Sequence, residues 1–164
     1  MTENKVIPLA VPDIGDDEID EIKKVMGTGF LTEGATTKEF EQMVADYLGV
    51  KHAIAVTSCT TGLHAVLHCL DIKGQEVIVP DYTYPATAEA VVLAGGIPVL
   101  ADVDLESMNM TSEILEESYN ENMTVFSPVS WAGVPLEKEI YQKAKKLDLK
   151  MLEDAACSLG AKIN

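Results

Sequence analysis

The sequence predicts an α/β protein whose sheet is mostly parallel and carries helices on both faces. Short runs of apolar and β-branched residues alternate with stretches in which apolar residues recur with the period of a helix. The chain has 164 residues, the usual size of one domain, and 47% of them are hydrophobic. Because strands that alternate with helices are joined by right-handed crossovers, we expect helices on both faces of the sheet.

Composition and charge argue against several function classes. No apolar run approaches the ~20 residues of a membrane-spanning helix, so no membrane partner is expected. The first residues lack an apolar leader with a cleavage site, which predicts a cytoplasmic protein. Twelve Lys and Arg against 27 Asp and Glu give a net charge of -15, which repels nucleic acid. The three cysteines have no CxxC spacing and suggest neither disulfides nor a zinc knuckle.

Residues 1–50 are expected to form a helical segment that precedes the sheet. Apolar stripes predict helices over 16–26 and 38–47. Thr36 and Glu39 have the spacing of a capping box for the second helix, and Gly49 is placed to end it.

The loop between these helices, residues 27–34, is rich in glycine and contains Phe30 and Leu31. It is either a packed connection or the lining of a site.

Strands and helices alternate over residues 51–164. The predicted strands are 53–56, 76–79, 97–103, 124–129 and 150–154. The predicted helices are 61–70, 84–94, 112–119 and 136–147. Ligands of such sheets bind at the carboxyl ends of the strands, so the residues that follow each strand are the candidates for a site.

The turn after the first predicted strand is rich in hydroxyl groups. It contains Ser58, Cys59, Thr60 and Thr61 and leads directly into a helix. Free N–H groups and hydroxyls at a helix start can hold a phosphate without any Lys or Arg. Ordinary N-capping by Ser or Thr is the alternative, and the GxxxxGK[ST] pattern of a P-loop is absent.

Two further strand ends carry ring and acid side chains. Tyr82 and Tyr84 follow the second strand, where an aromatic face could stack on a flat ligand or pack against the helix start. Asp154 ends the last strand, and an acid there is costly unless a cation, such as a protonated ring nitrogen, faces it. A helix N-cap is the alternative role for Asp154.

No metal site is expected from the sequence. Asp102 and Asp104 form an acidic pair without a third ligand at suitable spacing. His64 and His68 have the spacing of a zinc pair, but the glutamate of HExxH is missing.

Several ordered motifs resemble the DegT/DnrJ/EryC1/StrS family of pyridoxal-phosphate (PLP)-dependent aminotransferases, which act on nucleotide-linked ketosugars. The matching segments include Gly29-Phe30-Leu31-Thr32-Glu33-Gly34, Ser58-Cys59-Thr60-Thr61-Gly62-Leu63-His64, Thr83-Tyr84-Pro85-Ala86-Thr87 and Glu153-Asp154-Ala155-Ala156. The resemblance implies that residues 51–164 are the first, incomplete part of an aspartate-aminotransferase-like large domain of PLP fold type I.

The resemblance also implies roles for individual residues. The implied cofactor-binding residues are Ser58, Cys59, Thr60, Thr61, Tyr84, Asp154, Ala156 and Cys157. Among them, the turn at Ser58 would hold the phosphate and Tyr84 would stack on the pyridine ring. Asp154, the implied catalytic residue, would hold the protonated ring nitrogen. Phe30, Leu31 and Thr32 would lie on the substrate side.

Three departures from the family pattern qualify these roles. Cys157 stands where the family usually has Gln or His, and Ser130-Trp131-Ala132-Gly133 replaces a more usual His-x-aromatic-Gly. The Schiff-base lysine of the family is expected some two dozen residues beyond Asp154, outside this chain. We therefore expect that the chain alone does not transaminate, and that strand 53–56 lacks its sheet neighbour and exposes apolar surface.

The resemblance implies partners as well. They are a nucleotide-sugar substrate, an amino donor that is typically glutamate, and a second copy in a homodimer of the complete enzyme. Two alternatives remain: a non-catalytic partner or remnant that associates with a full-length aminotransferase, and a generic nucleotide-binding module. No GxGxxG follows a strand to support the latter.

Overall fold

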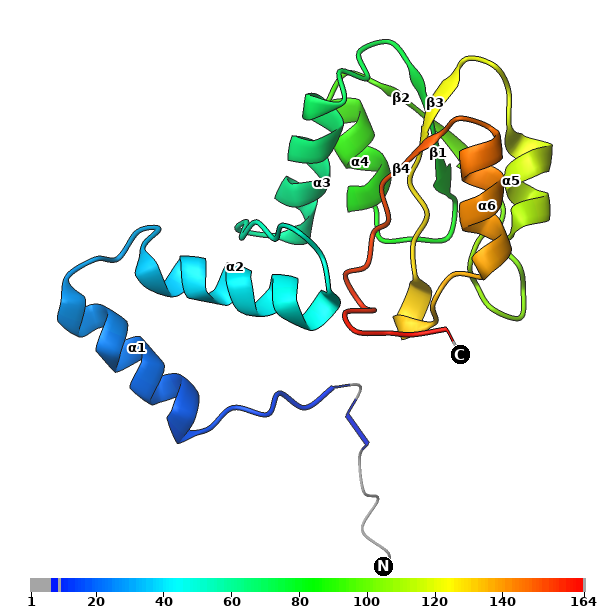
Figure 1. The fold of residues 1–164 in the computed structure, drawn as a ribbon. Coiled ribbons are helices and arrows are strands. Elements are labelled where there is room, and N and C mark those ends of the chain that lie inside the picture. The colour runs from blue at the N-terminus through cyan, green and yellow to red at the C-terminus, as the bar shows by residue number, and fades with distance from the viewer. Residues whose placement is uncertain (1–6, 9, 164) are drawn as a thin grey trace, which may run out of the picture. The chain divides into compact units, whose positions relative to one another are not determined.

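A computed structural model describes residues 7–8 and 10–163 of the chain (Figure 1). The chain divides into two compact units, Met1–Ala55 and Val56–Asn164. The first contains two helices and the second contains the sheet. Among the described helices, none combines the length and the apolar character needed to cross a membrane.

Both helices predicted in the first unit are present. They are α1 (Asp16–Thr28) and α2 (Ala35–Leu48). Helix α1 runs two residues further than predicted and ends at Gly29, whose φ of 73° is the left-handed conformation that glycine adopts without strain.

The capping box predicted at Thr36 and Glu39 is wrong. Helix α2 begins at Ala35 with Gly34 as its N-cap, so Thr36 already lies inside the first turn. The predicted end at Gly49 is confirmed, with a φ of 67°.

The second unit is built on a four-stranded sheet. Its strands are β1 (Glu76–Pro80), β2 (Ile97–Ala101), β3 (Met123–Phe126) and β4 (Lys150–Met151). They lie in the order β2-β1-β3-β4, and every neighbouring pair is parallel. The predicted parallel α/β architecture is therefore confirmed for this unit.

Helices cover both faces of the sheet (Figure 1). They are α3 (Cys59–Cys69), α4 (Ala86–Leu93), α5 (Ser112–Ser118) and α6 (Lys138–Lys146). Val77 and Val79 on β1 pack into one apolar cluster with α3 and α4, whereas Ile78 between them packs into a second cluster with α5 and α6. Alternate residues of a strand point to opposite faces, which explains how one strand serves two cores.

The predicted strand at residues 53–56 is wrong, because this segment pairs with no strand in the described part of the chain. The backbone N–H of Ala55 instead donates to Oε1 of Glu41 on α2, at 2.7 Å. Ile54 is 79% exposed and Val56 is also exposed. The apolar exposure expected for this segment is thus present, without the strand geometry.

The strands on either side of the candidate site are shorter than predicted. Strand β3 ends at Phe126 and β4 at Met151, and beyond them Val129 and Asp154 form an isolated parallel bridge. Between these points the two segments stay hydrogen-bonded, because the N–H of Leu152 donates to the carbonyl of Phe126 at 2.9 Å and the N–H of Asp154 donates to the carbonyl of Pro128 at 2.8 Å. The backbone that carries Asp154 is therefore held against the β3 segment beyond the ends of the strands.

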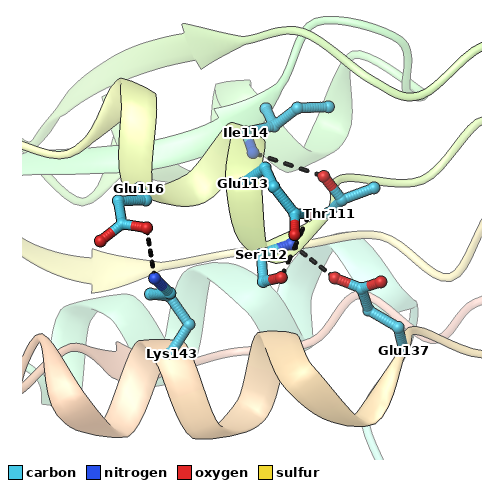
Figure 2. A network of polar contacts seen from close by, with 7 residues as sticks. All are labelled: Thr111, Ser112, Glu113, Ile114, Glu116, Glu137 and Lys143. Atoms are coloured by element: carbon cyan, nitrogen blue, oxygen red, sulfur yellow. Dashed lines mark hydrogen bonds and ion pairs between the residues drawn. The ribbon is translucent and has the colours of Figure 1, made fainter.

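Helices α5 and α6 are joined by the polar network in Figure 2. The hydroxyl of Thr111 caps α5 by accepting from the N–H of Ile114, at 3.3 Å. The N–H of Ser112 donates to Oε1 of Glu137, the residue before α6, at 2.5 Å. Lys143 on α6 forms an ion pair with Glu116 on α5. Glu137, the N-cap residue of α6, therefore also accepts a hydrogen bond from the first turn of α5.

Candidate active site

The first turn of α3 is capped by Ser58 and Thr61, which hydrogen-bond to each other. Ser58 is the N-cap: its Oγ accepts from the N–H of Thr61 at 3.2 Å, and its own N–H donates to Oγ1 of Thr61 at 3.0 Å. The N–H of Gly62 donates to the carbonyl of Ser58. The alternative of N-capping is thus realised at Ser58, and it leaves the N–H groups of Cys59 and Thr60 at the open end of the helix.

This turn has the character of an anion site. The start of α3 combines the positive end of the helix dipole with the N–H groups of Cys59 and Thr60, and the neighbouring residues Ser58 and Thr61 are exposed. Capping and anion binding do not compete for N–H groups, because the cap uses the N–H of Thr61 and not the two before it. The hydroxyls of Ser58 and Thr61 do take part in the cap, where they lie 2.8 Å apart.

Asp154 is the buried acid of the second unit, with a side chain in contact with three elements. It is 6% exposed. Its Oδ2 accepts from the hydroxyl of Thr87 on α4 at 2.8 Å. Its Oδ1 accepts from the N–H of Ala156 at 3.2 Å and from the thiol of Cys59 on α3 at 3.5 Å. Asp154 thus joins the starts of α3 and α4 to the end of the β4 segment.

The donors around Asp154 are all neutral. A carboxylate offers about four acceptor positions, and three of them are used by Thr87, Ala156 and Cys59. Within the described residues, Asp154 takes part in no ion pair. A buried carboxylate with one remaining acceptor position and no cation suits a ligand that brings a positively charged N–H of its own.

Tyr84 and Cys157 flank this acid on exposed segments. Tyr84 is 73% exposed, and its carbonyl accepts from the N–H of Thr87 at 3.2 Å. Ala156 and Cys157 follow Asp154 in an exposed turn. The structure therefore brings the predicted cofactor residues of the second unit to one edge of the sheet, at the carboxyl ends of the strands. Their binding roles remain predictions.

Comparison with known proteins decides the family. The DegT/DnrJ/EryC1/StrS aminotransferase family model matches residues 12–164. The chain belongs to this family. The resemblance drawn from the sequence is confirmed, and with it the aspartate-aminotransferase-like fold class.

Relatives of the chain are about twice its length or more. It is 39% identical to an uncharacterised protein of Methanocaldococcus jannaschii, MJ1066, over 98% of this chain and 42% of that protein. An aminotransferase from Psychrobacter cryohalolentis is 31% identical with a TM-score of 0.88, covering 94% of this chain and 40% of that one. The PLP form of a putative sugar aminotransferase from Streptococcus pneumoniae, Spr1654, is 29% identical with a TM-score of 0.88 (94% and 44%). The chain thus spans about two fifths of each.

The predicted substrate-side residues of this family member, Phe30, Leu31 and Thr32, lie in the first unit. They line a cavity of 680 Å³ whose walls also come from the end of α1 and the start of α2. Phe30 and Leu31 are 71% and 72% exposed, so the loop is not a packed connection in this structure. The substrate-side role of the three residues stays a prediction.

Sequence reasoning missed Thr87. This residue is 1% exposed and holds Asp154 through its hydroxyl, which also lies 3.0 Å from the hydroxyl of Thr83. The spacing of two threonines four residues apart at a helix start was visible in the sequence. It did not identify the acceptor, because Asp154 lies 67 residues away in the chain.

No cluster of three or more His, Cys, Asp or Glu side chains that could hold a metal ion is found among residues 7–8 and 10–163. The rings of His64 and His68 lie edge to face, with centroids 6.4 Å apart.

Cys59 is expected to be a poor nucleophile despite its place at a helix start. Partial burial and the negative charge of Asp154 raise the pKa of its thiol to about 11, so the thiol stays protonated at neutral pH. Cys59 and Cys69 are both exposed, but because the thiol of Cys59 has the raised pKa we expect iodoacetamide to label it more slowly than Cys69, as measured by peptide mass spectrometry. In Asp154→Asn the charge is gone, the pKa falls, and labelling of Cys59 should accelerate. Equal rates in the two proteins would contradict the role given to Asp154.

Proposed function

We propose that the protein is a PLP-dependent sugar aminotransferase and that the second unit contributes its cofactor site. One observation supports this proposal: a buried carboxylate, which has no cationic partner in the described part of the chain, contacts the first turn of a helix whose leading N–H groups take no part in the cap. A phosphate and a protonated ring nitrogen would satisfy both features. Membership of the aminotransferase family and the PLP form of the Streptococcus pneumoniae relative support this choice.

Different residues are proposed to bind different parts of the cofactor. The first turn of α3 holds the phosphate through the N–H groups of Cys59 and Thr60 and the hydroxyls beside them. Asp154 accepts a hydrogen bond from the ring nitrogen and keeps it protonated. Tyr84 covers one face of the ring. Bound in this way, the cofactor would supply an electron sink for the removal of the α-proton of the amino donor.

The substrate is proposed from the family. It is a nucleotide-linked ketosugar, with glutamate as the amino donor, and the complete enzyme acts as a cytoplasmic homodimer. Phe30, Leu31 and Thr32 are proposed to contact the sugar side.

The 164 residues alone are proposed not to transaminate, since the family's lysine is expected outside them. A non-catalytic partner of a full-length aminotransferase remains the second candidate. The exposed apolar residues of α1 and α2, which include Ile22, Met26, Phe40 and Met43, would suit such an association.

Binding of pyridoxamine phosphate tests the proposal without interference from surface lysines, because this form of the cofactor has no aldehyde. Isothermal titration calorimetry of the chain should show one saturable site. Pyridoxamine, which lacks the phosphate, should bind at least about tenfold more weakly, because it loses the charge-assisted hydrogen bonds at α3. Equal affinity for the two ligands, or no binding of either, would sink the proposed site.

A further inference from the structure

We propose that Asn109 is a positioning residue of the cofactor site, which it controls by holding the loop 130–134 against the segment that carries Asp154. Its effect on ligand binding rests on the proposed function, but its effect on the loop does not. Asn109 lies at no strand end and in no motif singled out from the sequence. It is 4% exposed.

The side chain of Asn109 grips the loop 130–134 near both ends. Its Oδ1 accepts from the N–H of Trp131 at 2.8 Å, and its Nδ2 donates to the carbonyl of Val134 at 3.0 Å. The backbone of Asn109 is itself fixed, because its carbonyl accepts from the N–H of Asp104 at 2.9 Å and its N–H donates to Oγ of Ser107 at 3.3 Å. A fixed amide thus uses both its donor and its acceptor on one loop.

These two hydrogen bonds offset the strain in the backbone of the loop. Ala132 has a φ of 51°, a left-handed conformation that costs an alanine about 1 kcal/mol. Gly133 follows with a φ of 85°, and a Cβ there would come within 3.2 Å of the carbonyl oxygen of Cys157. The loop therefore lies close to the turn after Asp154 and adopts a conformation that it would not keep unaided.

The loop is also tied directly to Asp154. The N–H of Ser130 donates to the backbone carbonyl of Asp154 at 3.1 Å, and the Ser130 hydroxyl donates to the carboxylate of Glu153. Tyr141 on α6 donates to the other oxygen of Glu153 at 2.9 Å. A shift of the loop would consequently disturb the backbone on which the Asp154 carboxylate is mounted.

An aromatic pair completes the arrangement. The ring of Trp131 packs against that of Tyr82, which follows β1, with centroids 4.7 Å apart and planes tilted by 55°. Strands β1 and β3 are neighbours in the sheet, so this pair lies at the same edge of the sheet as the bridge between Val129 and Asp154. By holding the loop, Asn109 therefore influences the position of the Trp131 ring and of the Asp154 carboxylate.

Fluorescence of Trp131, the only tryptophan of the chain, tests this role directly. In Asn109→Ala the emission should shift to longer wavelength and quenching by acrylamide should increase, because the loop opens to water. Asn109→Asp keeps the acceptor for Trp131 but places a buried carboxylate oxygen against the carbonyl of Val134, so the shift should be at least as large as in Asn109→Ala. Asn122→Ala, at an exposed turn, is the matched control.

Calorimetry with pyridoxamine phosphate on the same proteins gives the second readout. We expect the affinity to fall about tenfold in Asn109→Ala, the scale of one or two hydrogen bonds, and to stay unchanged in Asn122→Ala. Circular dichroism verifies that each variant remains folded.

The two readouts separate the two hypotheses. If the emission and quenching of Trp131 are unchanged in a folded Asn109→Ala variant, Asn109 does not hold the loop 130–134 and the proposal is overturned. If both Asn109 variants lose the native circular dichroism, Asn109 is a general structural residue and the proposal is overturned. If the affinity holds while the emission shifts, Asn109 holds the loop, but its role as a positioning residue of the cofactor site is overturned. If the unmodified chain binds no pyridoxamine phosphate, the proposed function fails, and the emission data still decide whether Asn109 holds the loop.

Discussion

Replacing Asp154 by asparagine is expected to weaken binding of pyridoxamine phosphate about 10- to 100-fold, because hydrogen bonds to charged groups contribute about 1.5–3 kcal/mol. The asparagine keeps the size of the carboxylate and an acceptor oxygen for Thr87, but it no longer stabilises a positively charged ring nitrogen. Calorimetry at neutral pH measures the change.

Asp148→Asn is the matched control for this prediction. Asp148 is exposed and has a φ of 56°, a conformation that asparagine also tolerates, so its affinity and its fold should not change. An Asp154→Asn variant that binds as tightly as the unmodified chain would remove Asp154 from the ring site and leave it as a structural acid.

Phe126→Ala is expected to have the largest effect on stability. Phe126 lies at the centre of the sheet, is fully buried, and packs in the cluster with Ile78 and Leu115. Truncation of a buried phenylalanine costs about 3–5 kcal/mol, a large share of the 5–15 kcal/mol that stabilises a typical domain. The urea midpoint measured by circular dichroism should fall sharply.

Leu105→Ala provides the comparison, since Leu105 is 85% exposed and its truncation should shift the midpoint very little. If Phe126→Ala unfolds at the same urea concentration as Leu105→Ala, the described core is not the one that stabilises the protein.

The architecture of the second unit could be predicted because its signal is local. Each strand is a short apolar run, each helix has an apolar stripe, and the alternation of the two fixes the crossovers. Asp154 could be singled out for the same reason, because it follows a strand recognised from its own residues. The turn at Ser58 was located from a strand that is not present, but its hydroxyl residues and the helix that follows them were recognised correctly.

Features that depend on distant partners could not be read from the sequence in the same way. Residues 53–56 have a strand-like composition, but a strand also requires a hydrogen-bonded neighbour, and Glu41 provides the only contact for the N–H of Ala55 among the bonds described. Thr87 and Asn109 are ordinary polar residues in the sequence. Their importance lies in acceptors and donors that only the folded chain brings to them.

The contact between Cys59 and Asp154 joins residues 95 positions apart, near the two ends of the second unit. A ligand held by both the first turn of α3 and Asp154 would link the two ends of this long segment. Since a ligand that binds only the folded state stabilises it by mass action, amide hydrogen exchange should slow across the whole unit and not just beside the ligand. The proposed ligand site is thereby also the point at which the first and last segments of the unit would become one cooperative structure.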